Sequence, residues 1–135
     1  MTAAVHRTYF SSIHAVLLAG TIPLFLGALL SDLAYWSYYH IQWNNFASWL
    51  IAGALVFAGL ALLCAVIDLL RGERPWVYIL LLVATWILGF INALVHAKDA
   101  WATMPEGLIL SVIVVVLAIA ATFFGFCGLR VGGAK

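Results

Sequence analysis

The chain of 135 residues has the length of one domain, and its composition excludes an ordinary soluble protein. Hydrophobic residues make up 67% of it and charged residues 8%, whereas a soluble domain carries about 25% charged residues. The net charge of +1, with no basic cluster, gives no reason to expect a nucleic-acid partner. Both cysteines, Cys64 and Cys127, lie in apolar runs, where we expect buried thiols rather than a disulfide or a metal site.

The first predicted membrane span covers residues 12–36, and Pro23 within it should bend the helix. The apolar stretch is long for a signal peptide and no small-residue cleavage site follows, so we interpret it as a retained anchor. Residues 37–46 are predicted to form an uncharged aromatic loop at the membrane interface. The small and polar residues of the span share one helical face: His14, Thr21, Ala28, Asp32 and Tyr35.

The second predicted span, residues 47–70, carries a stripe of small residues suited to close helix packing. The stripe ends in an acid and consists of Ala54, Ala58, Ala61, Ala65 and Asp68. Residues 71–75 then form a compact turn, in which Gly72 can close one helix and Pro75 can open the next.

The third predicted span, residues 75–97, has the most polar stripe: Thr85, Gly89, Asn92, His96 and Asp99. Because an amide, an imidazole and a carboxylate are costly in hydrocarbon, this face should look into protein or water. The exit loop should end in a capping box formed by Thr103 and Glu106. The fourth span, residues 107–129, repeats the pattern with Ser111, Val115, Ala118, Thr122 and Gly125.

These elements predict an all-α fold, with residues 1–135 forming one integral membrane domain. Each span of about 22 residues gives roughly 33 Å of helix, enough for a bilayer core of about 30 Å. Short loops favour a four-helix bundle with antiparallel neighbours. The basic residues predict that both termini are cytoplasmic, because Lys98 stands alone on the other side. The cytoplasmic set is Arg7, Arg71, Arg74, Arg130 and Lys135.

This orientation sorts the polar residues into two layers. The outer layer comprises Asp32, Asn92, His96, Asp99 and Ser111, with His40 and Lys98 at a similar depth. The inner layer comprises His14, Asp68, Arg71 and Arg130. By helix rise, His14 and His96 lie on the order of 30 Å apart, so they cannot both bind one haem.

Several roles remain open for the charged residues of the two layers. His96 suits a haem ligand, a proton carrier or a quinone contact, or it hydrogen-bonds Asp32 or Asp99 and fixes the helix register. Asp32 has Lys98 or His96 as a partner. For Asp68 we favour an ion pair with Arg71, and His14 either reaches the interface, pairs with Asp68 or binds a group supplied by another protein.

The order of motifs resembles bacterial membrane proteins grouped as domain of unknown function 2231. The resemblance is carried by LLSDLAYW (29–36), QWNNFASWL (42–50), INALVHAKDAW (91–101), PEGLILSVIVVVL (105–117) and FGFCGLRVGG (124–133). Relatives resemble membrane anchors found beside cytochrome c or sugar-dehydrogenase modules, so the resemblance implies a redox neighbourhood. The chain departs from the family where Ala15 follows His14 in place of a proline, and where residues 76–80 lack a histidine and a Gly-Asn.

The first functional hypothesis is a small non-catalytic subunit or accessory protein of a larger complex in the bacterial inner membrane, redox or energy-converting in kind. We expect no enzyme, no catalytic residues and no metal site, since P-loop, dinucleotide, G-x-S-x-G and H-E-x-x-H motifs are missing. One alternative is an electron-transfer protein that binds haem b or quinone, with His96, His40, His14 and Asn92 as candidate cofactor-binding residues. Another is a component of a proton or small-solute pathway.

Overall fold

The structure, a computed structural model, describes the backbone of residues 2–72 and 76–133 and the side chains of residues 12–72 and 76–127. Within these residues the chain is helical, with no strand. The elements are α1 (Thr2–Tyr38), α2 (Ile41–Leu70), α3 (Trp76–His96), α4 (Ala100–Thr103) and α5 (Glu106–Gly133). The long helices α1, α2, α3 and α5 are each long and apolar enough to cross a membrane.

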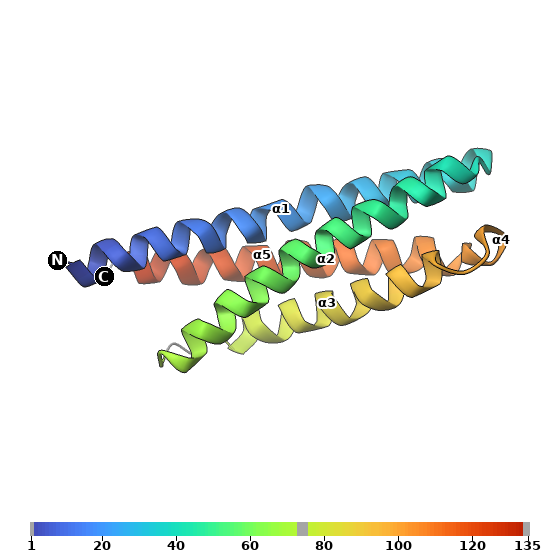
Figure 1. The fold of residues 1–135 in the computed structure, drawn as a ribbon. Helices are drawn as coiled ribbons and strands as arrows, with labels where there is room; N and C mark the ends of the chain where they lie inside the picture. The colour runs from blue at the N-terminus through green and yellow to red at the C-terminus, as the bar shows by residue number, and fades with distance from the viewer. Residues whose placement is uncertain (1, 73–75, 134–135) are drawn as a thin grey trace.

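The four long helices form a ring of contacts (Figure 1). Helix α1 packs against α2 and α5, and α3 packs against the same two helices, so α1 and α3 are diagonal partners. The start of α1 and the end of α5 lie at the same end of the molecule (Figure 1). Along α1 and α2, the Phe57 ring covers Gly20, whereas the Leu50 side chain lies against Gly27.

The predicted aromatic loop over residues 37–46 is wrong, because both flanking helices extend into it. Only Tyr39 and His40 separate α1 from α2, and Tyr39 makes the bend with a φ of 55°. Hydropathy marks where the apolar side chains end, whereas helical hydrogen bonds continue into the polar interface. Most aromatic side chains around this bend are exposed, although Tyr35 is buried, and the Tyr39 ring stacks on Trp101 with centroids 6.0 Å apart.

The turn after α2 contains the predicted glycine. Gly72 has a φ of +96°, a conformation that residues with a side chain rarely adopt, and the Arg71 N–H donates to the carbonyls of Ile67 and Asp68. Gly72 therefore ends the helix as expected. The proposed role of Pro75 at the start of α3 lies outside the described residues.

The predicted capping box before α5 is not formed. Thr103 instead belongs to the short helix α4, and its hydroxyl donates to the Asp99 carbonyl at 3.3 Å. Helix α5 starts at Glu106, three residues after Thr103, and the Met104–Pro105 peptide bond between them is cis.

The inward-facing stripes lie in the interior. The predicted face of α5 is buried along its whole length, as are the four alanines of α2 and the α1 face that includes His14 and Asp32. On α3 the stripe is buried from Thr85 to His96, but Asp99 is exposed because the helix ends at His96.

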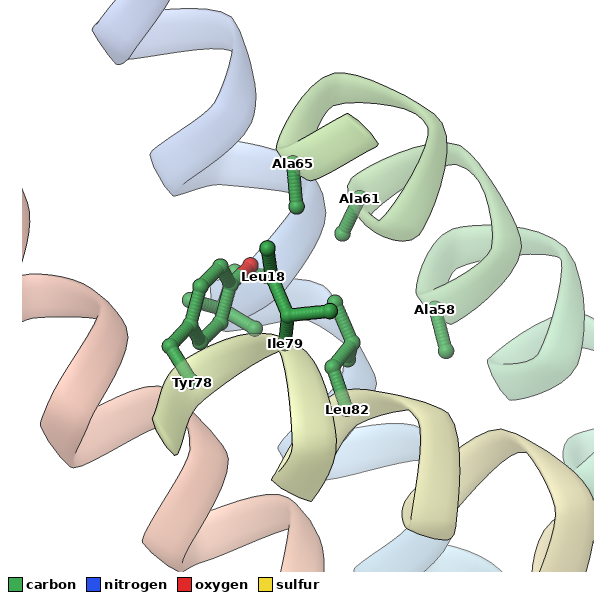
Figure 2. Packing of buried hydrophobic residues seen from close by; sticks show 7 residues of the cluster. All are labelled: Leu18, Ala58, Ala61, Ala65, Tyr78, Ile79 and Leu82. Atoms are coloured by element: carbon green, nitrogen blue, oxygen red, sulfur yellow. The ribbon is translucent and has the colours of Figure 1, made fainter. Parts of the chain in front are cut away.

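Alanine on α2 lets the helices approach closely. Figure 2 shows Ala58, Ala61 and Ala65 facing Leu18 of α1 and Ile79 and Leu82 of α3. A second apolar cluster lies further along the bundle: Phe25, Ala28, Ile51, Ala54, Val114, Val115 and Ala118. In a lipid solvent, such small-residue contacts gain van der Waals packing that bulkier side chains would prevent. The apolar middle of the bundle therefore separates its two polar ends.

Candidate functional site

Asp32 is the centre of a buried polar cluster at the end of the bundle where α1 and α3 finish. Its side chain has no exposed surface. Oδ1 lies 2.7 Å from Nε2 of His96 on α3, and Oδ2 accepts a short hydrogen bond from the Ser111 hydroxyl on α5. Ser111 in turn accepts a bond of 2.9 Å from the Asn92 side-chain amide. Three of the four long helices are thus joined by one chain of hydrogen bonds.

The protonation of this cluster follows from its acceptors. Nδ1 of His96 lies 2.9 Å from the Asn92 carbonyl oxygen, which can only accept, so Nδ1 carries a hydrogen. The contact between Nε2 and Asp32 Oδ1 must then hold one proton, because two bare acceptors would repel each other in a dry site. Imidazolium with carboxylate and imidazole with carboxylic acid both satisfy this geometry, and both give the pair no net charge.

Close packing fixes the His96 ring in addition to these bonds. A Cβ added at Gly107 of α5 would lie 3.0 Å from Cε1 of His96 and 2.8 Å from Thr103 Cγ2. Glycine therefore lets α5 approach the imidazole. Binding a haem iron through His96 would require the ring to give up its bond to Asp32 or to the Asn92 carbonyl.

A second polar cluster occupies the opposite end of the bundle. Nε2 of His14 on α1 and the Tyr78 hydroxyl on α3 are 2.6 Å apart. Nδ1 of His14 lies 3.5 Å from Asp68 Oδ2 on α2, without the geometry of a hydrogen bond. Tyr78 packs on Gly125 of α5, where an added Cβ would meet its ring at 2.9 Å. Of the roles considered for His14, pairing with Asp68 is the one seen.

Between the two clusters, threonines are the buried polar residues, and their hydroxyls bond within their own helices. Thr21, Thr85 and Thr122 each donate to a backbone carbonyl of the preceding turn at 2.7 Å. Tyr78 and His96 are 18 positions apart on α3, which is about 27 Å of helix. The described residues therefore contain two separate polar clusters rather than one continuous polar path.

An open hollow of about 360 Å³, lined mostly by residues with polar side chains, adjoins the cluster around Asp32. It opens between the start of α2 and the end of α3, and His96 forms part of its wall. Its polar lining residues are Gln42, Asn44, Asn45, Ser48, His96 and Lys98. Asn44 is buried, and its Oδ1 has no hydrogen-bond partner among the described residues.

The structure brings only some of the predicted site residues together. Asp32, Asn92, His96 and Ser111 meet at one end, and among the candidate cofactor residues Asn92 and His96 are neighbours. The rest of the predicted residues lie apart from that cluster. His14 is at the other end of the bundle, and the Arg130 side chain is not described. The exposed residues are His40, Asp99, Arg71 and Lys98, of which Lys98 lies 3.8 Å from Glu106.

Sequence reasoning missed two residues that an extended stripe would have included. Tyr78 precedes Thr85 by seven residues on the buried face of α3, and Asn44 lies ten residues before Ala54 on that of α2.

The suggested pairing of Asp68 with Arg71 stays a prediction. The expectation of two buried thiols is wrong, since Cys64 is half-buried and Cys127 is exposed; a lipid-facing thiol is compatible with an apolar run.

Comparison with known proteins agrees with this architecture. A family model described as "Predicted membrane protein (DUF2231)" matches residues 11–128. No curated protein and no solved structure gave a significant match. The family model spans all four long apolar helices and both polar clusters, and it confirms the resemblance noted in the sequence. The chain therefore belongs to the family of predicted membrane proteins called domain of unknown function 2231.

Proposed function

We propose that the protein is a small non-catalytic subunit or accessory protein of a larger complex in the bacterial inner membrane, of a redox or energy-converting kind. In this proposal the four spans form an antiparallel bundle with both termini in the cytoplasm. The observation that carries it is the internal use of the polar groups: Asp32, His96 and Ser111 bond to one another and join helices. Such a network specifies helix register, as a scaffold requires.

Among the described residues no reactive site is assembled, and this supports the proposal over catalysis. Both ring nitrogens of His96 are engaged, and the Ser111 hydroxyl donates to the Asp32 carboxyl group, whose other oxygen is held by His96. Among the described residues, no group of three or more His, Cys, Asp or Glu side chains is placed to hold a metal ion. The threonine hydroxyls of the middle are bonded to their own helices, which speaks against proton movement through this chain alone.

The exposed surface supports a protein that works inside the bilayer. Large apolar side chains cover the outside of the spans, and the connections between helices are short. The basic residues, five on one side and Lys98 on the other, support cytoplasmic termini. The link to a redox complex is supported by the family resemblance alone.

The test is the mass of the native assembly. The tagged protein, expressed from its own locus, would be extracted with a mild detergent and analysed by native mass spectrometry. We expect a complex of fixed stoichiometry that contains further membrane subunits, since a scaffold is bound to what it holds. A tagged four-helix membrane protein of similar size and abundance is the control. Recovery of the free monomer alone would contradict the proposal.

A further inference from the structure

We propose that the open hollow beside His96 binds a phosphate ester that carries a free hydroxyl, as in the headgroup of a glycerol phospholipid. The hollow lies at one end of the membrane-spanning helices, close to exposed aromatic residues such as Trp43 and Trp101. Aromatic side chains of this kind gather at headgroup depth. A volume of about 360 Å³ is within the range of small-molecule sites.

The charge of the lining favours an anion. Among the described residues that form the wall, Lys98 is the cation and there is no carboxylate. Its Nζ lies 3.8 Å from Glu106 Oε2, and both side chains are more than half exposed. An exposed pair at that distance is weak, so a phosphate can compete for the ammonium group. The carboxamides of Gln42 and Asn45 add hydrogen-bond donors that suit phosphate oxygens.

We infer from Asn44 that the ligand carries a hydroxyl group. The residue has only 6% of its surface exposed, and its Oδ1 lacks a partner among the described residues. The Ser48 hydroxyl cannot supply one without giving up its bond of 2.9 Å to the Asn44 carbonyl. Asn44 itself lines the hollow, and because the terminal torsion of an asparagine is broad, a small rotation of the amide can present Oδ1 to a ligand there. A ligand that donates a hydrogen bond there satisfies a buried acceptor.

These features rank the common headgroups. Phosphatidylglycerol offers both a phosphate and hydroxyl donors. Phosphatidylethanolamine offers a donor that carries a positive charge, which Lys98 repels. Phosphatidylcholine has no hydrogen-bond donor for Asn44. We therefore expect binding to fall in that order. The inference does not depend on the proposed partner complex, because it concerns the isolated chain.

The test uses the full-length protein, delipidated in an uncharged detergent and titrated with each lipid at equal acyl-chain length, with bound lipid counted by native mass spectrometry. Lys98→Gln should weaken phosphatidylglycerol binding about fivefold, and Lys98→Arg should keep it. Asn44→Ala should reduce the preference for phosphatidylglycerol over phosphatidylcholine. Ser37→Ala, an exposed change on α1 outside the hollow, is the control.

A second experiment, with a water-soluble ligand, distinguishes a lipid headgroup from a free phosphate ester as the occupant of the hollow. Glycerol 3-phosphate would be added to the protein in phosphatidylcholine nanodiscs, and binding would be followed by ligand-observed NMR. Lipid preference without binding of the soluble ester supports a headgroup site, whereas binding of the ester without lipid preference supports the same site with a soluble occupant. Equal affinity for the three lipids without ester binding, or wild-type binding by Lys98→Gln, would overturn the proposal.

Discussion

Asp32 is the residue on which the polar cluster depends, because it accepts from Ser111 and shares a proton with His96. A carboxyl group and a carboxamide have the same shape, and an amide at this position can donate to Nε2 and still accept from Ser111. Alanine can do neither. The two substitutions therefore separate the loss of a charge from the loss of hydrogen bonds.

We expect Asp32→Ala to lower the free energy of unfolding by about 3 kcal/mol, because it leaves His96 buried without its partner. Asp32→Asn should stay within about 1 kcal/mol of wild type if the pair is neutral imidazole and carboxylic acid. Unfolding in mixed micelles by SDS titration measures both. Ser31→Ala is the control, since its hydroxyl bonds to the Gly27 carbonyl of its own helix. Equal losses for the two Asp32 variants would mean that the pair is ionised.

At the scale of helices, the packing depends on glycines placed where a side chain from another element comes close. Gly107 makes room for His96, and Gly125 makes room for Tyr78 and for Leu18, whose Cδ2 would lie 2.6 Å from an added Cβ. At Gly53 of α2, in contrast, the nearest atom is 3.8 Å away. Gly107, Gly125 and Gly53 can therefore be compared, because an added side chain would be crowded at the first two positions and would fit at the third.

Gly125→Ala and Gly107→Ala should each lower the free energy of unfolding by about 1–3 kcal/mol, as overpacked core positions do. Gly53→Ala should be neutral or stabilising, since alanine is the better helix former by about 1 kcal/mol. Thermal unfolding followed by circular dichroism compares the three variants in one detergent. A loss at Gly53 as large as at Gly125 would show that close contact with a neighbouring helix is not what requires glycine at Gly125.

The helix stripes show how far the sequence leads at this scale. Thr85, Gly89, Asn92 and His96 could be assigned to one buried face because polar groups facing lipid are costly, and all four lie in the interior. The ends of the helices were harder to predict. The start of α2 at Ile41 and the short α4 depend on how backbone bends near Tyr39 and Thr103, and composition does not encode these bends.

At the scale of the whole molecule, the two polar clusters should act independently, because an apolar core and about 27 Å of helix separate them. Tyr78→Phe removes the partner of His14 and should cost about 1 kcal/mol. Combined with Asp32→Ala, the two losses should add to within about 0.5 kcal/mol, as distant sites do. SDS titration of the double-mutant cycle measures this. A larger coupling energy would show that the two clusters communicate.

The orientation of the bundle can be tested in intact cells. Cys64 and Cys127 would first be replaced by alanine, and Arg71→Cys or Ala102→Cys would then be introduced at exposed positions of opposite connections between the long helices. If both termini are cytoplasmic, an impermeant maleimide should label Ala102→Cys and leave Arg71→Cys unlabelled until the cells are lysed. The reverse pattern would place the termini outside.

The class of protein, the number of apolar helices and the inward face of each could be read from the order of the residues, because the cost of polar groups in hydrocarbon acts locally along every helix. It limited the partners of His96 and of Asp32 to two candidates each, and it kept His14 apart from His96. The packed bundle was needed to show that His96 pairs with Asp32, that Tyr78 bonds to His14, and that Asn44 lines a hollow with an oxygen that has no partner among the described residues. These contacts depend on the relative rotation and height of packed helices, which side-chain shape in three dimensions sets.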